Sequence, residues 1–150
     1  MIRLVTSCDE KAIIQLGNEM HCASRYAWIP FSPERFWKTV MQCGQSELGY
    51  AKVFENEKKE VIGGLMGVLQ PYYFSDAMSA HDLAVFVQAG MRGGIAANLL
   101  LRDFENWADD HQAIEVRLGV TAGIKDDLAG KLYKRLGYQE AGTLFVKRIV

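Results

Sequence analysis

The sequence predicts a single α/β domain of the α+β kind, in which helices cover a mixed and mostly antiparallel sheet. Its 150 residues match the size of one ordinary domain. Apolar residues make up 49% of the chain, which is enough for a hydrophobic core. Stretches with strand periodicity alternate with stretches of helical periodicity, and no internal repeat is present. We therefore expect residues 1–150 to form one domain without a linker.

The first half of the chain predicts a strand, two helices and a hairpin. Residues 2–5 have the pattern of a short strand, and a capping box that starts at Ser7 begins a first helix. Ser32, followed by proline at the first helical position, begins a second helix. Two runs of β-forming residues with a polar stretch between them then predict an antiparallel hairpin, over 48–55 and 61–69.

The second half predicts a parallel crossover followed by a helix and two strands. The apolar run 83–87 is typical of a central strand with both faces covered, and an amphipathic helix follows over 94–110. Because a strand is expected again at 114–120, this unit implies a right-handed parallel connection. A last helix begins at 126, and 138–150 predicts two short strands. The expected order is strand, helix, helix, three strands, helix, strand, helix and two strands.

Composition argues against several classes of function. A formal net charge of −1 gives no basic field to hold a nucleic-acid backbone, so no nucleic acid is expected as a partner. No apolar stretch is long enough to cross a membrane, so no membrane partner is expected. Cys8, Cys22 and Cys43 are widely spaced without a CxxC pair or a suitably placed histidine, so we expect free thiols and no metal. Together these features favour a cytoplasmic protein.

The turn between the apolar strand and the long helix predicts an anion-binding site. Backbone N–H groups without a partner gather there, at the positive end of the helix dipole. Gly93 and Gly94 leave those donors accessible, while Ala96 and Ala97 keep the first helical turn narrow. The spacing matches neither a P-loop nor a dinucleotide fingerprint. On the glycines alone, a plain strand-to-helix turn is the favoured interpretation.

The residues Val87-x-x-x-x-Arg92-Gly-Gly-Ile-Ala-Ala97 resemble motif A of the GNAT superfamily of acyl-CoA N-acyltransferases, V-x-P-x-x-R-x-x-G-x-G/A. The version they most resemble is the R-G-G-x-A-G/A form of phage and prophage members. Ala89 replaces the usual proline and Ile95 replaces the first motif glycine. A second register, with Gly94 and Ala96 at the small positions and Met91 at the arginine position, is also open.

A second motif strengthens the resemblance. The segment from Asp126 to Tyr138, with Leu-Tyr-x-x-Leu-Gly-Tyr at its end, is similar to the helix that follows motif A in this superfamily. The matching elements cover roughly residues 80–142. The resemblance implies the GNAT fold, in which the fourth and fifth strands splay apart, with acetyl-CoA as the co-substrate.

The resemblance also implies where acetyl-CoA binds. The main chain of the fourth strand would pair with pantetheine, and the turn and first helical turn would hold the pyrophosphate. The residues expected to bind acetyl-CoA are Val85, Phe86, Val87, Arg92, Gly93, Gly94, Ile95, Ala96, Ala97, Asn98, Asp126 and Tyr133.

Three residues are candidates for proton transfer. Tyr133 stands where many members of the superfamily direct a hydroxyl toward the departing thiolate, and an acid of pKa about 10 suits that task. A core tyrosine is the alternative, because an apolar stripe runs beside it. His81 and Asp82 stand where a base is usual, and adjacent strand residues point to opposite faces, so without a bulge only one of them faces the cleft.

The sequence carries little information about the acceptor substrate. The expected reaction is direct attack of a primary amine on acetyl-CoA in a ternary complex, with a small-molecule or peptide amine as the acceptor. Two aromatic-rich segments, 21–31 and 71–74, are expected beside the acceptor pocket, where they could bind substrate, cap the pocket or form a homodimer contact. The alternative function is a non-catalytic GNAT-shaped structural or interaction protein, for example a phage component that binds coenzyme A weakly or not at all.

Overall fold

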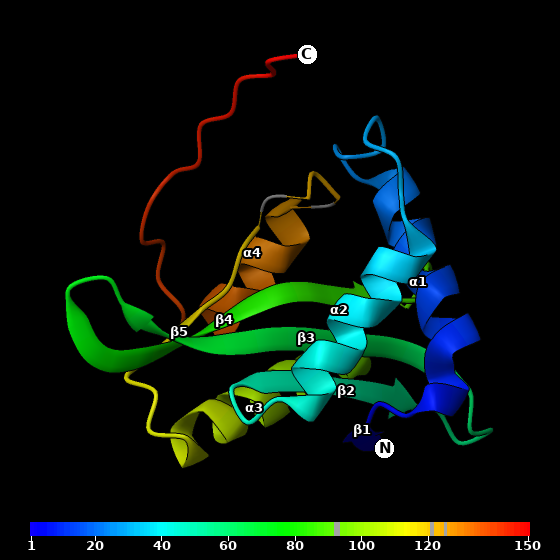
Figure 1. Ribbon diagram of the computed structural model, residues 1–150, viewed down its shortest axis with the longest axis horizontal. Helices are drawn as coiled ribbons and strands as arrows, with labels where there is room; N and C mark the ends of the chain where they lie inside the picture. The colour runs from blue at the N-terminus through cyan, green and yellow to red at the C-terminus, as the bar shows by residue number, and fades with distance from the viewer. Residues whose placement is uncertain (92–93, 121, 125) are drawn as a thin grey trace.

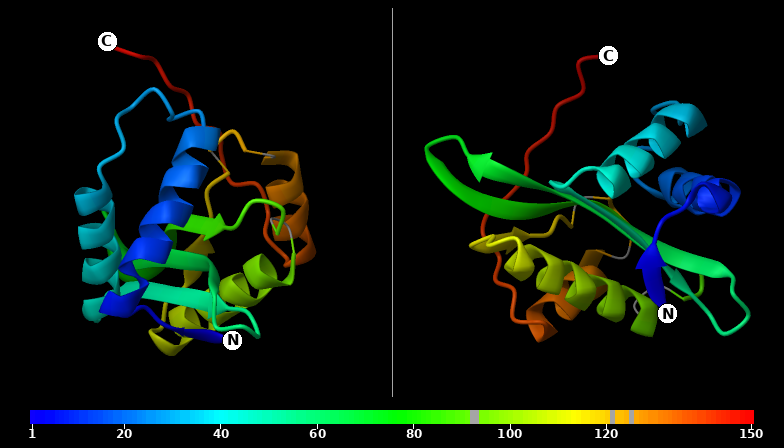
Figure 2. Two further views of the ribbon diagram at one scale, coloured as in Figure 1. Left: turned by 90° about the vertical axis from the view of Figure 1, so that its right-hand side faces the viewer. Right: turned by 60° about the horizontal axis from the view of Figure 1, so that its bottom comes forward.

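A central sheet separates two pairs of helices (Figures 1 and 2). The computed structural model describes residues 1–91, 94–120, 122–124 and 126–150. The strands within this part are β1 (Ile2–Leu4), β2 (Gly49–Glu55), β3 (Val61–Tyr72), β4 (Ser75–Val87) and β5 (Glu115–Arg117). The helices are α1 (Glu10–Ala23), α2 (Pro33–Gln45), α3 (Ile95–Asp110) and α4 (Asp126–Arg135), and a 3₁₀ turn over Ser7–Asp9 precedes α1.

The strands follow the chain in the order β1-β2-β3-β4-β5. All neighbouring strands are antiparallel except β4 and β5, which are parallel. This arrangement confirms the predicted mixed sheet and the parallel crossover around α3. Strand β4 is much longer than the predicted run 83–87. Its first half carries small and polar residues, so the apolar pattern did not reveal it. That half lies in the arm of the β3–β4 hairpin that extends beyond the helices in Figure 1.

Helices α1 and α2 cover one face of the sheet, as the right-hand view of Figure 2 shows. Ile13 and Leu16 of α1 and Val40 of α2 are buried there against Val53 and Phe86 of the sheet. The predicted cap of α2 is confirmed, because Ser32 Oγ accepts a hydrogen bond from the Arg35 N–H at 3.2 Å.

The turn before α1 begins one residue earlier than predicted. Thr6 takes the place expected for Ser7, and its N–H donates to Asp9 Oδ2 at 2.8 Å. Arg3 also holds the Asp9 carboxylate, with both terminal nitrogens 2.8 Å from its oxygens. Two overlapping patterns, Thr6-x-x-Asp9 and Ser7-x-x-Glu10, fit a capping box, and the structure forms the first, in which Arg3 of β1 also pairs with Asp9.

Helices α3 and α4 cover the opposite face. Leu100, Leu101 and Phe104 of α3 are at most 1% exposed and pack against Leu65 and Ala80. Helix α4 adds a partly buried apolar edge to this layer with Leu132, Tyr133 and Leu136. The amphipathic pattern predicted for 94–110 therefore faces the sheet.

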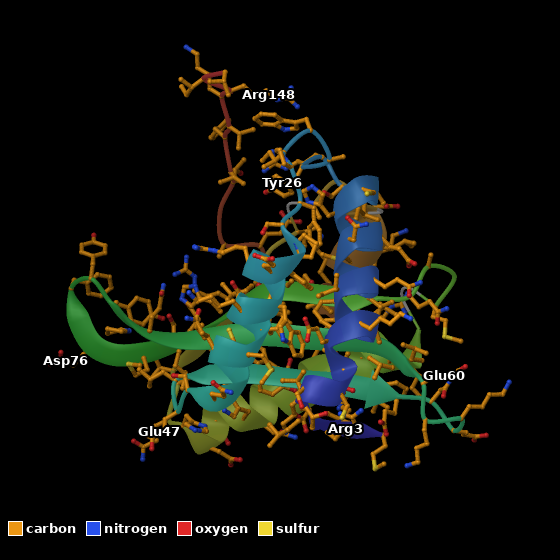
Figure 3. All side chains as sticks on the ribbon, turned by 45° about the vertical axis from the view of Figure 1, so that its right-hand side comes forward. Arg3, Tyr26, Glu47, Glu60, Asp76 and Arg148 are labelled. Carbon is orange, nitrogen blue, oxygen red and sulfur yellow. The ribbon has the colours of Figure 1, made fainter. Side chains whose placement is uncertain are left out.

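The two strands predicted within 138–150 are absent, and this prediction was wrong. Residues 141–150 have no regular structure and are exposed. A strand needs a sheet edge to pair with, and β5 continues for only three residues before the chain diverges from the sheet. The tail runs instead toward the connection between α1 and α2, where the Arg148 guanidinium lies 3.9 Å from the Trp28 ring centre. Figure 3 shows this tail beside the connection that carries Tyr26.

Candidate functional site

A cavity of about 560 Å³ opens where the chain after β5 diverges from β4. Its walls come from both helix layers, from β4 and from the segment that follows β5. The lining residues with a bearing on chemistry are Asp82, Val85, Val87, Ala97, Tyr133, His21 and Tyr26. The predicted splaying of the fourth and fifth strands is therefore present in the structure.

The gap arises because the parallel ladder is short. Pairing of β4 with β5 begins at Ser79 and Glu115 and ends at His81 and Arg117. Beyond this point β4 pairs only with β3, so its other edge borders the cavity. A bulge follows at once, because Gly67 and Met66 pair with Asp82 and Ala84, which leaves Leu83 as the additional residue. Leu83 is 50% exposed, so the apolar run 83–87 is not covered on both faces as predicted.

Asp82 lies on the cavity wall beside this bulge. Its Oδ1 accepts a hydrogen bond of 2.9 Å from the Gly119 N–H, which ties the carboxylate to the segment after β5. Burial raises the pKa of Asp82 to about 6, although the Gly119 hydrogen bond partly opposes this rise. The carboxyl group can therefore bind and release a proton near neutral pH, as proton-transfer groups commonly do.

Tyr133 lies on the same cavity, in the middle of α4. Burial raises the pKa of its hydroxyl to about 12, and the nearby negative charge of Asp82 adds to the rise. The hydroxyl therefore keeps its proton over the whole neutral range and can act as a hydrogen-bond donor. The alternative interpretation also has support, since the Tyr133 ring packs in the α3–α4 layer.

His81 does not line the cavity. Its Nε2 lies 2.7 Å from Ser79 Oγ and 3.5 Å from Gln70 Nε2, on the arm of the β3–β4 hairpin. Burial lowers the pKa of the imidazole, the positive charge of Arg117 lowers it further, and Glu115 partly offsets both. The bulge at Leu83 shifts the alternation of β4, so that Asp82 and not His81 lies on the same face as Val85 and Val87, and only Asp82 of the two candidate bases borders the cavity.

The residues expected to hold pantetheine divide between two faces of β4. Val85 and Val87 line the cavity. Phe86 points to the other face, where it is 2% exposed and its ring centre lies 6.0 Å from that of Phe36. A role for Phe86 in binding acetyl-CoA is therefore limited to its main chain.

The residues expected to hold the pyrophosphate meet at the start of α3. Gly94 is the N-cap and is exposed, Ile95 is 71% exposed, and Ala96 and Ala97 are buried. Only Ala97 of these borders the cavity. Asn98 is half-buried and accepts a hydrogen bond of 3.0 Å from Arg102 Nε.

Three residues of the expected acetyl-CoA set cannot be placed in this way. Arg92 and Gly93 lie outside the described residues. Asp126 opens α4, but its side chain lies outside the described part of the structure. The choice between the two registers of the turn therefore stays open.

The α1–α2 side of the cavity was only coarsely predicted. Its wall consists of Gly17, Met20, His21, Ser24, Tyr26, Phe31 and Phe36. Of these, Gly17, Met20 and Phe36 were not expected at the site. A glycine inside α1 was a usable signal of close helix packing at this point, because any side chain at Gly17 would collide with the Phe36 ring. The other aromatic segment, 71–74, forms the hairpin tip and does not border the cavity; Tyr73 is fully exposed there.

Neither a metal cluster nor a membrane span is found in the part of the chain that the structure describes. Within it, no group of three or more His, Cys, Asp or Glu side chains is arranged to hold a metal ion. Likewise, none of the helices in that part combines the length and the apolar character that crossing a membrane requires.

Comparison with known proteins identifies the fold. No family model and no curated protein matches the sequence. Among solved structures, the chain is similar to the aminoglycoside 6′-N-acetyltransferase AAC(6′)-IG of Acinetobacter haemolyticus, with a TM-score of 0.74, 17% identity and coverage of 100% of this chain and 99% of that one. It is similar to a ribosomal-protein-alanine N-acetyltransferase of Brucella melitensis biovar Abortus 2308, with a TM-score of 0.74, 15% identity and 99% coverage of both chains.

A third similar structure contains a ligand. It is AAC(6′)-Iy in complex with the bisubstrate analog CoA-S-monomethyl-acetylneamine, with a TM-score of 0.78, 13% identity and coverage of 99% of this chain and 96% of that one. The chain therefore has the acetyltransferase fold over its whole length, which confirms the predicted fold apart from its last two strands.

Proposed function

We propose that this protein is an acetyl-CoA-dependent N-acetyltransferase, in which a primary amine attacks the acetyl group directly in a ternary complex. One observation carries the proposal. A single cavity joins Ala97 in the first turn of α3, the partly buried Asp82 and Tyr133 through the gap beside β4. The similarity to acetyltransferases supports the same reaction class, while the cavity residues supply the chemistry.

The α3–α4 side of the cavity has the features that acetyl-CoA requires. Val85, Ala97 and Leu132 give it a narrow apolar wall suited to a pantetheine arm. Beyond the cavity, the first turn of α3 presents N–H groups that have no partner within the helix, at the positive end of its dipole. A diphosphate at this position would be held by backbone donors. Bound acetyl-CoA would supply the thioester from which the acetyl group is transferred.

In this proposal Asp82 removes the proton from the attacking amine. An ammonium group cannot attack, so the acceptor must lose a proton before or during the reaction. Asp82 borders the gap, and a carboxyl group with a pKa of about 6 is mostly ionised at neutral pH. The hydrogen bond from Gly119 fixes the orientation of the carboxylate, which keeps one oxygen engaged.

Tyr133 donates a hydrogen bond to the sulfur as the carbon–sulfur bond breaks. Its pKa of about 12 is well above that of a thiol, near 8.5, so the sulfur does not take the Tyr133 proton completely. The hydroxyl therefore stabilises negative charge on sulfur by hydrogen bonding, and the thiolate is finally protonated from water. This role differs from full proton transfer in that it leaves Tyr133 neutral throughout.

The decisive experiment is calorimetric titration of the protein with acetyl-CoA. We expect binding, and we expect Gly94→Asp to weaken it strongly. Gly94 has a φ of −88°, which other residues can adopt, and an added Cβ would lie 3.1 Å from the Met91 carbonyl oxygen in both variants compared here. Aspartate is a good N-cap that preserves the helix, but its charge repels a diphosphate.

Gly94→Asn is the matched control, because asparagine caps the helix equally well without adding a charge. It should bind acetyl-CoA more tightly than Gly94→Asp. If the unmodified protein does not bind acetyl-CoA, the proposed function is wrong and the alternative of a non-catalytic protein is favoured.

The two candidate bases can be separated by turnover. Asp82→Asn should slow acetyl transfer to an active amine by about 100-fold, the lower range for loss of a general base. His81→Gln should leave the rate within a few fold, since His81 lies outside the cavity. The reverse result would exclude Asp82 and restore His81 as the base.

A further inference from the structure

The acceptor end of the cavity differs chemically from the end proposed for acetyl-CoA. From the composition and charge of its walls we infer that the acceptor is a small monoamine with an aromatic or aliphatic body, and not a polyamine. This inference rests on the proposed acetyl transfer. It adds the chemical class of the second substrate.

The two ends of the cavity belong to opposite faces of the sheet. Ala97 and Tyr133 come from the α3–α4 layer, where acetyl-CoA is proposed to enter. Met20 of α1 and Phe31, whose ring contacts that of Phe36 in α2, come from the other side. Asp82, at the gap beside β4, lines the same cavity as both groups. An amine that reaches Asp82 from the side opposite acetyl-CoA must therefore leave its body among the α1–α2 residues.

Aromatic rings dominate this acceptor end. The ring centres of His21 and Phe31 are 5.3 Å apart, and those of Phe31 and Phe36 are 5.4 Å apart. His21 is held in place by a 2.7 Å contact between its Nε2 and the Ile29 carbonyl. A row of tilted rings offers an apolar surface on which an aromatic or aliphatic group can pack, with favourable edge-to-face contacts for a ring.

The charges favour a single ammonium group. Among the described residues that line the cavity, Asp82 is the only acid, and none is Lys or Arg. It can balance one positive charge beside the gap. A second ammonium group at the α1–α2 end would lie among apolar rings, where the described residues supply no further acid, and burying an unpaired charge is strongly unfavourable.

Positive charges outside the acceptor end add to this preference. The Arg25 guanidinium lies 4.4 Å from the Tyr26 ring centre, and its Nη2 donates to the Tyr26 hydroxyl at 2.8 Å. Arg148 lies over Trp28 in the same connection (Figure 3). A polyamine such as an aminoglycoside would meet the Arg148 guanidinium as it approaches this connection, and repulsion would slow its binding.

The size of the cavity favours a small acceptor. The cavity of about 560 Å³ must hold the acceptor together with the end of the pantetheine arm. The Arg25 N–H donates to the Ala122 carbonyl at 2.8 Å, so the α1–α2 connection bridges to the segment after β5. This bridge restricts the opening on the acceptor side. A compact amine fits these limits better than a folded protein surface.

The experiment measures amine binding directly, so that it does not depend on turnover. The full chain, with and without saturating coenzyme A, is titrated calorimetrically with 2-phenylethylamine, spermidine and kanamycin. We expect 2-phenylethylamine to bind at least about tenfold more tightly than either polyamine. Equal or tighter binding of spermidine or kanamycin, or no binding of 2-phenylethylamine at millimolar concentration, would overturn the inference. Absence of acetyl-CoA binding in the separate titration would instead overturn the proposed function.

A pair of variants tests the charge argument. Tyr26→Glu adds a carboxylate to the acceptor end, and we expect it to reduce the preference for 2-phenylethylamine over spermidine by about tenfold or more. Tyr73→Glu makes the same chemical change at the fully exposed hairpin tip, and should leave the preference unchanged. An equal shift in both variants would show that the effect is not local and would count against the inference. If Tyr26→Glu fails to fold, as checked by thermal unfolding, the comparison of amines on the unmodified protein still decides.

Discussion

Replacing Asp82 by Asn should slow acetyl transfer and yet stabilise the folded protein at neutral and alkaline pH. Burial raises the pKa of the Asp82 carboxyl group from 3.8 to about 6, which means that the ionised form is disfavoured in the folded chain. A rise of this size lowers the free energy of unfolding by about 3 kcal/mol at a pH where the carboxyl group is ionised. Asparagine retains an oxygen that can accept the 2.9 Å hydrogen bond from the Gly119 N–H, but it carries no charge.

The expected stabilisation depends on pH in a defined way. Because the folded-state pKa of Asp82 lies above its unfolded value, the folded chain binds more protons between pH 3.8 and about 6, and stability falls as the pH rises through this window. The full penalty of about 3 kcal/mol is present at pH 8, about 1.5 kcal/mol remains at pH 5, and about 0.5 kcal/mol at pH 4. The stability of Asp82→Asn relative to the native chain should follow the same curve.

Urea denaturation followed by tryptophan fluorescence between pH 4 and pH 8 measures this difference. Asp76→Asn is the matched control, since Asp76 is exposed near the hairpin tip (Figure 3) and its replacement should change stability by less than about 0.5 kcal/mol at any pH. The reasoning is refuted if Asp82→Asn is less stable than the native protein at pH 8. It is also refuted if the difference does not narrow toward pH 4.

Three further predictions address the proposed hydrogen-bond donor, the start of the chain and the bulge. Tyr133→Phe should lower the turnover of an active amine by about 10- to 100-fold and leave calorimetric acetyl-CoA affinity nearly unchanged; an unaltered rate would remove Tyr133 from the mechanism. Arg3→Met should destabilise the fold by about 2 kcal/mol, because Asp9 is only 4% exposed and its carboxylate would lose its cation. Urea denaturation measures this change, and an unchanged midpoint would contradict the prediction. Gly67→Ala should destabilise by about 2 kcal/mol, since an added Cβ would lie 2.7 Å from the His81 carbonyl and from the Phe104 ring; a neutral effect would show that the strands next to the bulge can separate.

Local patterns predicted the regular elements well as far as Arg135. Helical spacing of Ile13 and Leu16 reports which face of α1 is apolar, and that property belongs to one segment alone. Patterning failed at 138–150, where alternating β-forming residues predicted strands. Strand formation depends on a free and sufficiently long partner edge elsewhere in the chain, and β5 offers only three paired residues.

The candidate site was predicted in part. The Gly-rich turn and the Leu-Tyr-x-x-Leu-Gly-Tyr segment led to the prediction that the start of α3 and Tyr133 belong to the site, and Ala97 and Tyr133 do line one cavity. The choice between His81 and Asp82 could not be made, because it depends on a bulge at Leu83 that the register between β3 and β4 creates. Phe36 was not expected at the site. Phe31 and Phe36 flank the Ser32 cap of α2 at the positions of a hydrophobic staple, so their contact is local, but only the packing of α2 against Gly17 of α1 brings Phe36 to the cavity.

The sequence by itself therefore determined the order of elements up to α4, the crossover around α3 and the positions of the two motifs. The order and the crossover follow from the periodicity and turn chemistry of continuous segments, whereas the two motifs were recognised by their resemblance to those of a known superfamily. The tertiary structure alone decided which of the two candidate bases borders the cavity and where the acceptor end lies. It also decided that the C-terminal tail forms no strand. These features arise from pairing register and from contacts between distant segments, so no single segment encodes them.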